Sequence, residues 1–133
     1  MLYLWVAIGG ALGSVGRAWM ALAVTRLTGP AFPWGTILIN ILGSFVIGFA
    51  AGIFQADTRL VIPIDLRVFV TAGLCGGFTT FSAFSLQTVD LARDGRWMQA
   101  GSNVVLSVVL CVVATAAGYC AAGLMNAGAR PSA

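Results

Sequence analysis

The stretch GLCGGFTTFSAFS, from Gly73 to Ser85, decides how this chain folds. It lies in the middle of a charge-free segment, Val68–Val89, that is long enough to cross a bilayer as one helix. Three glycines within five residues, followed by a run of hydroxyls, loosen the backbone hydrogen bonds of such a helix. Freed backbone groups are tolerated at membrane depth only beside protein or a polar cavity. The sequence therefore predicts a spanning helix that is broken near residues 73–80 and offers backbone groups to an ion.

The rest of the chain has the composition of a membrane protein. Of its 133 residues, 59% are hydrophobic and only 8% are charged. Charge-free runs, the first interrupted by Arg17, predict four transmembrane helices at about 2–24, 34–55, 67–91 and 98–124. Because the connections are short, we expect an all-α membrane protein with a single four-helix transmembrane domain over residues 1–133.

The residue types argue against an enzyme. The chain has no histidine, glutamate or lysine, and its four aspartates (Asp57, Asp65, Asp90 and Asp94) fall at helix ends or in loops. General acid–base catalysis and side-chain metal sites therefore lack their usual groups. The three cysteines (Cys75, Cys111 and Cys120) lack metal-ligand spacing, and Cys75 and Cys120 are expected to pack as small apolar side chains. The net charge of +3 is too small and dispersed to indicate nucleic-acid binding.

The arginines are divided evenly between the two sides of the membrane. With four spans, each side carries three: Arg59, Arg67 and Arg130 on one, and Arg26, Arg93 and Arg96 on the other. Orientation follows the difference between such counts, which here is close to zero. The even division predicts insertion in both orientations and an antiparallel homodimer whose two-fold axis lies in the membrane plane. The alternative is a single orientation set by Arg93 and Arg96.

Polar residues within the spans recur at helical spacing. On the second predicted helix they form the stripe Thr36, Asn40 and Ser44. On the fourth they form the stripe Asn103, Ser107, Cys111 and Thr115. A cluster follows the break in the third helix: Thr80, Ser82, Ser85, Gln87 and Thr88. Such groups can hold helices together, which is the role expected for Ser44 and Thr115. Two aligned stripes beside a broken helix also favour a polar pathway. The glycine pairs Gly9/Gly13 and Gly48/Gly52 are expected to serve close helix packing.

The groups available to such a pathway are hydrogen-bond donors. No span contains an acidic residue that could balance a cation. The amides of Asn40 and Asn103, the hydroxyls and the positive ring edges of Phe81 and Phe84 can all contact an anion. Arg17 adds one positive charge near a helix end. This lining favours a small, hard anion that needs replacements for its bound water.

The same residues give the chain its resemblance to a known family. Along essentially its whole length it resembles the bacterial fluoride channels called Fluc or CrcB. The match rests on GGALGSVGR at 9–17, WGTILINILG at 34–43, the Gly73–Ser85 stretch and, more loosely, the polar stripe of the last helix. The run GGFTTFSAF, at 76–84, is the most specific part.

The resemblance implies an antiparallel, dual-topology dimer with two fluoride pores and one central, structural sodium ion. It implies that backbone carbonyls of Gly76 and Thr79 from both subunits hold the sodium. A hard cation prefers such oxygen ligands, and a two-fold axis doubles each contribution. The phenylalanines of the fluoride path correspond to Phe81 and Phe84.

Further site residues follow from the same resemblance. The pore asparagine corresponds to Asn40 and the vestibule arginine to Arg17. Ser107 and Cys111 match fourth-helix positions where the family often has small polar residues. Thr36, Thr80 and Ser82 are expected on the same path. The chain departs from many relatives at two positions. It has Gln87 where they have a glutamate, and Asn103 where they have a tyrosine. An amide therefore has to serve at both positions.

We therefore expect a fluoride-selective channel that is embedded in the lipid of the bacterial inner membrane and exports fluoride passively. Two alternatives belong to other classes. A small multidrug transporter also has four helices and dual topology, but it depends on a membrane-embedded glutamate, which this chain lacks. A non-transporting assembly subunit would have no need of a broken third helix.

Overall fold

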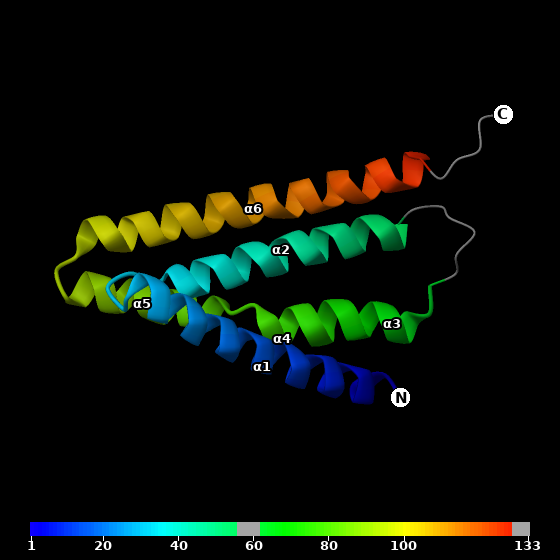
Figure 1. Cartoon of the computed structure of the whole chain (residues 1–133), viewed down its shortest axis with the longest axis horizontal. Coiled ribbons are helices and arrows are strands. Elements are labelled where there is room, and N and C mark those ends of the chain that lie inside the picture. The colour runs from blue at the N-terminus through cyan, green and yellow to red at the C-terminus, as the bar shows by residue number, and fades with distance from the viewer. Residues whose placement is uncertain (56–61, 129–133) are drawn as a thin grey trace.

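The computed structural model describes residues 1–55 and 62–128, and every regular element in those ranges is a helix (Figure 1). Three spans are continuous: α1 (Leu2–Thr28), α2 (Trp34–Gln55) and α6 (Trp97–Gly128). The third is assembled from α3 (Ile64–Val68), the π-helical η1 (Phe69–Cys75), α4 (Gly76–Phe78) and α5 (Phe81–Arg93). An all-helical chain with four spans and a broken third span is thus confirmed.

All four spans are long and apolar enough to cross a membrane. The third, Ile64–Arg93, reaches 30 residues when its pieces are counted together. The N-terminus and the end of α6 lie at the same end of the bundle (Figure 1). Of the arginines used to predict orientation, Arg59 and Arg130 lie outside the described residues, as does Asp57.

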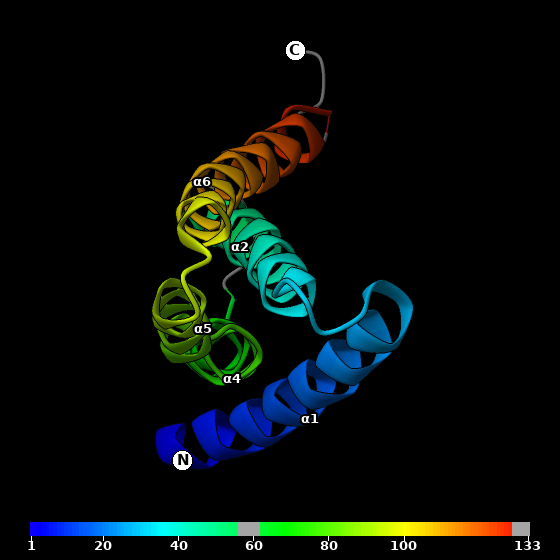
Figure 2. The same cartoon turned by 90° about the vertical axis from the view of Figure 1, so that its left-hand side faces the viewer.

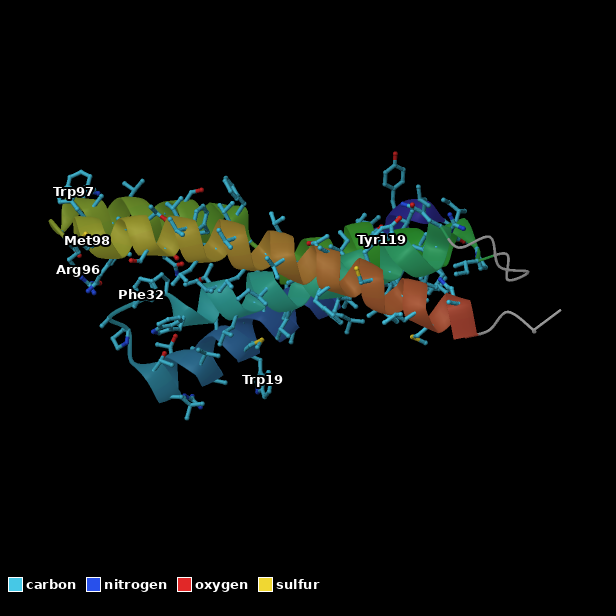
Figure 3. All side chains as sticks on the ribbon, turned by 90° about the horizontal axis from the view of Figure 1, so that it is seen from above. Trp19, Phe32, Arg96, Trp97, Met98 and Tyr119 are labelled. Carbon is cyan, nitrogen blue, oxygen red and sulfur yellow. The ribbon has the colours of Figure 1, made fainter. Side chains whose placement is uncertain are left out.

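Tight turns at the opposite end join consecutive spans. Gly29 ends α1 with φ 78°, and Gly95 follows α5 with φ 75°, a conformation that glycine adopts without steric cost. The guanidinium of Arg96 donates a hydrogen bond to the carbonyl of Ala31 and so ties the two turns together. Figure 3 shows Phe32, Arg96 and Trp97 gathered at this end and Tyr119 toward the other. Aromatic side chains at both ends of the spans suit the two membrane–water interfaces.

The most extensive contact between helices is that of α2 with α6. A Cβ atom on Gly48 would overlap the carbonyl of Thr115, and one on Gly118 would overlap the carbonyl of Phe45. The two backbones therefore touch directly, as small residues allow in membranes. A Cβ on Gly52 would lie 2.6 Å from that of Ala122. The packing role expected for Gly48 and Gly52 is confirmed.

Helix α1 packs on the third span by the same means. A Cβ on Gly9 would lie 2.7 Å from the carbonyl oxygen of Phe69, and one on Gly13 would overlap that of Leu74. From the other side, a Cβ on Gly77 would lie 2.5 Å from the carbonyl oxygen of Gly10. Seen along the bundle, α1 approaches α4 and leans away from α6, with α2 between them (Figure 2). The resulting fold has a largely apolar exterior, and the exposed surface around Phe81 is called the open face below.

The break in the third span is narrower than the glycine run that predicted it. Gly76 is helical, with φ −62° and ψ −38°. The backbone becomes extended only at Thr79 (φ −80°, ψ 158°) and Thr80 (φ −151°, ψ 109°). The break thus falls at the C-terminal end of the predicted range, at the two threonines and not at Gly76. Gly73 and Gly77 are needed because α1 packs against their Cα atoms.

Candidate ion site at the helix break

The extended residues of the third span are held by one side chain of α2. The N–H of Thr80 donates to Asn40 Oδ1 at 2.8 Å, and Asn40 Nδ2 donates to the carbonyl of Thr80 at 3.2 Å. The amide thus pairs with both backbone groups of a single residue, as a neighbouring strand would. Asn40 thereby satisfies polar groups that would otherwise be costly to leave unpaired inside a membrane.

This pairing also changes the hydrogen bonding just before the break. In a continuous helix the N–H of Thr80 would donate to the carbonyl of Gly76. Here it donates to Asn40 instead, so the Gly76 carbonyl lacks its usual helical donor. The preceding carbonyl, of Cys75, accepts from both the N–H and the hydroxyl of Thr79, each at 2.9 Å. The break therefore frees a backbone oxygen at Gly76 while its neighbour remains paired.

The beginning of α5 presents hydrogen-bond donors. The hydroxyl of Thr80 caps the helix by accepting from the N–H of Ala83 at 3.2 Å, and it lies 3.2 Å from the hydroxyl of Ser82. The N–H groups of the first helical turn have no intrahelical acceptor, and the helix dipole makes this end positive. An anion near Phe81 would meet both effects.

A cavity of about 320 Å³ opens at the break. Residues of α2, the third span and α6 line it: Asn40, Gly43, Ser44, Ile47, Thr71, Cys75, Gly76, Thr79, Thr80, Phe81, Phe84, Ser107, Val108 and Cys111. None of these described lining residues carries a charge. The cavity therefore offers hydroxyl and amide donors within a mainly apolar wall.

The two phenylalanines at this cavity differ in environment. Phe84 is 8% exposed and belongs to the core, whereas Phe81 is 77% exposed and projects from the subunit. Their ring centroids lie 5.3 Å apart, with an interplanar angle of 48°. The pair thus runs from the interior of one subunit to its open surface.

The structure brings seven of the expected site residues to this cavity: Asn40, Gly76, Thr79, Thr80, Phe81, Phe84 and Ser107. Four other expected path residues, together with Arg17, do not line it: Thr36, Ser82, Asn103 and Gln87. Thr36 is buried, and Arg17 lies half-buried on α1. Ser82 reaches the cavity only through its contact with the Thr80 hydroxyl.

Asn103 connects α6 to α5 from within the core. It is fully buried, and its Nδ2 donates to the hydroxyl of Thr88 at 2.8 Å. Its Oδ1 accepts from the hydroxyl of Ser107 at 3.4 Å, and Ser107 in turn lines the cavity. Asn103 therefore orients a cavity residue without itself facing the cavity.

Gln87 lies in a different place from the rest of the expected path. It borders a second cavity, of about 300 Å³, at the end of the bundle that carries the tight turns. Asp90 and Asp94 border the same cavity, together with residues 30–33. The Oε1 atom of Gln87 is buried and has no hydrogen-bond partner among the described residues.

Several cavity residues were not expected from the sequence. The sequence predicts a packing role for Ser44 and an apolar role for Cys75, yet both line the cavity, as does Thr71. Cys111, which belongs to the polar stripe of the fourth helix, lines it as well. Ser44 and Cys111 follow Asn40 and Ser107 by one helical turn, so the stripes contained this signal. Thr71 and Cys75 lie four residues apart on the third span, so helical spacing alone places them on one face.

The family of the chain follows from comparison with known proteins. A family model described as "CrcB-like protein, Camphor Resistance (CrcB)" matches residues 4–119. The chain belongs to the CrcB family. The resemblance expected from the sequence is thereby confirmed.

Three CrcB relatives carry the name "Fluoride-specific ion channel FluC". The protein of Methylocella silvestris is 51% identical over 124 residues, which cover 93% of this chain and 95% of the relative. That of Opitutus terrae is 52% identical over 125 residues, covering 94% and 95%. That of Rhodospirillum rubrum is 51% identical over 128 residues, covering 96% and 99%.

These names describe ion channels, and the CrcB family is not enzymatic, which confirms the interpretation drawn from the residue types. Together with the four spans, they make the chain a multi-pass membrane protein.

Proposed function

We propose that the chain is a fluoride-selective channel of the bacterial inner membrane that lets cytoplasmic fluoride leave down its gradient. The observation that carries this proposal is the cavity at the helix break. Its polar groups are uncharged donors, and the pair of phenyl rings leads from it to the open face of the subunit. The name shared by relatives of about half-identical sequence supports fluoride as the ion.

The chemistry of the cavity suits a small anion better than a cation. Fluoride holds its water strongly, so an efficient path must replace that water with other donors. The hydroxyl of Thr80 and the first N–H groups of α5 are such donors, and ring edges add weaker positive contacts. The described lining contains no carboxylate, which also argues against a proton-coupled multidrug transporter.

A structural sodium ion at the break is part of the proposal. The described residues contain no group of three or more His, Cys, Asp or Glu side chains that could hold a metal, so the ligands proposed for sodium are backbone oxygens at the break. The Gly76 carbonyl, freed by the turn of Thr80 toward Asn40, suits a hard cation, as does the carbonyl of the extended Thr79. When bound, sodium would supply positive charge at the break. It would also hold together the segments whose carbonyls bind it.

The second subunit of the proposal is an antiparallel copy of the same chain. Two carbonyls from one subunit do not complete the shell of a hard cation, whereas a two-fold axis through the ion doubles them. The exposed Phe81 and the open face beside the cavity would lie against that partner. Each dimer would then contain two equivalent fluoride paths and one central sodium site.

Fluoride release from vesicles tests the function directly. The purified protein is placed in liposomes loaded with potassium fluoride, a potassium ionophore is added, and a fluoride electrode records the efflux. We expect rapid release of fluoride and none of chloride from chloride-loaded vesicles. Equal release of both anions would refute selectivity. Vesicles that release neither would favour a non-transporting subunit, and uptake of a lipophilic cation driven by a pH gradient would favour the transporter.

A further inference from the structure

We infer that Asn40 and Gly43 act together as positioning residues: they form a seat on α2 that holds the third span open at Thr79–Thr80. The seat is one helical turn of α2 facing the two extended residues of the break. This inference deepens the proposed function and rests on it, because the opened backbone is what supplies the ion sites.

The Asn40 half of the seat acts on the backbone. Its amide occupies both the N–H and the carbonyl of Thr80. If the N–H of Thr80 were released, its nearest alternative in a regular helix would be the carbonyl of Gly76. The amide therefore competes with helix closure, and closure would consume the oxygen proposed for sodium. Asn40 also borders the cavity, but two of its polar atoms are already committed to Thr80.

The Gly43 half of the seat acts through shape. A Cβ atom on Gly43 would overlap the Cγ2 methyl of Thr79, while the Cβ of Thr79 would remain at an ordinary 3.6 Å. The missing side chain of Gly43 is thus a socket for a single methyl group. Because Asn40 and Gly43 lie three residues apart on one helix, they fix consecutive residues of the break from the same face.

The contact between Gly43 and Thr79 can be tested with a pair of substitutions. Gly43→Ala should displace Thr79 and lower fluoride efflux about tenfold. Thr79→Ser removes the offending methyl but retains a hydroxyl that can donate to the Cys75 carbonyl. In the Thr79→Ser background, Gly43→Ala should therefore lower efflux less than about twofold. Gly101→Ala is the matched control, because a Cβ there meets nothing within 4 Å, and its efflux should equal that of the wild type.

A second experiment tests the backbone role of Asn40. Asn40→Ala should let the third span close, so amide hydrogen exchange across residues 79–80 should slow by about tenfold or more relative to exchange after a matched alanine substitution at Ser44. The sodium dependence of dimerisation should be lost at the same time. A residue that only lined the path would alter efflux and leave both the exchange and the sodium dependence as they were, which would overturn the inference.

The outcomes separate this inference from the proposed function. If the wild type releases no fluoride, the channel proposal fails, whereas exchange at residues 79–80 and the stability of the four proteins of the substitution cycle still test the seat. If the wild type conducts fluoride but Gly43→Ala lowers efflux equally in both backgrounds, the seat is refuted and the channel proposal stands.

Discussion

Phe81 and Phe84 are separated by one helical turn, but the subunit covers only one of them. Phe84 is part of the core, so its replacement affects both the fold and the path. Phe81 projects from the open face, so its replacement changes the surface offered to an ion or to a partner while leaving the core intact. The two positions can therefore separate conduction from stability.

Isoleucine at either position should lower fluoride efflux. It keeps an apolar side chain of similar bulk but removes the positive ring edge, and we expect a loss on the order of tenfold in vesicle efflux. Phe84→Ile should also lower the stability of the folded protein by about 1 kcal/mol or more, whereas Phe81→Ile should hardly change it. Wild-type efflux from both variants would rule out a role for the rings in the path.

At the scale of elements, the contact between α1 and the third span depends on the absence of side chains. Gly13→Ala should disrupt it, because the new Cβ would overlap the Leu74 carbonyl, and backbone cannot move aside as a flexible side chain can. We expect a loss of about 1–3 kcal/mol in stability, measured by denaturant titration of the purified protein.

Gly10→Ala is the matched control for this contact. It changes the same helix by the same methyl group, but a Cβ at Gly10 meets nothing within 4 Å in the subunit. If both variants were equally stable, close packing at Gly13 would not be what holds α1 to the third span.

The sequence predicted the elements more completely than the contacts between them. Four apolar runs, separated by short polar connections, were sufficient for the spans, and the Gly73–Ser85 stretch located the break within a few residues. The angles at the break could not be predicted locally, because Thr80 is extended through its pairing with Asn40, forty residues earlier. For the same reason the cavity contains Ser44 and Cys75, which were expected to serve packing, and leaves out Thr36.

At the scale of the whole molecule, orientation in the membrane should be easy to bias. The sequence places three arginines on each side of the four spans, so neither side has an excess of the residues that set orientation. We expect reporters fused to the C-terminus to signal from both the cytoplasm and the periplasm. Three added lysines at the C-terminus should favour one orientation and reduce the yield of dimer. A signal from one compartment alone would contradict dual insertion.

The proposed sodium site predicts an effect of substitution at Gly76 that the structure of a single subunit does not predict. Gly76 is helical, and a Cβ there would come no closer than 3.8 Å to the Thr71 carbonyl oxygen. A Cβ atom is therefore accommodated within one subunit, and the helical angles of Gly76 give no reason to expect backbone strain. We nevertheless expect Gly76→Val to abolish efflux and dimerisation, because the residue would face the partner and the ion.

Exhaustive exchange into sodium-free buffer should act in the same way, loosening the dimer and silencing both paths together. Dimer content and efflux are measured before and after exchange and again after sodium is restored. Unchanged behaviour in all three samples would remove the ion from the proposal. Tolerance of Gly76→Val would remove the contact at the two-fold axis.

The pairing of Thr80 with Asn40 also bears on how the chain is made. The third span cannot rest alone in lipid, since its extended residues would present unpaired backbone groups to hydrocarbon. Synthesis runs from the N-terminus, so α2 enters the membrane first and its amide is already present when the break emerges from the ribosome. The order of the helices in the gene thus supplies each newly made third span with its partner on arrival.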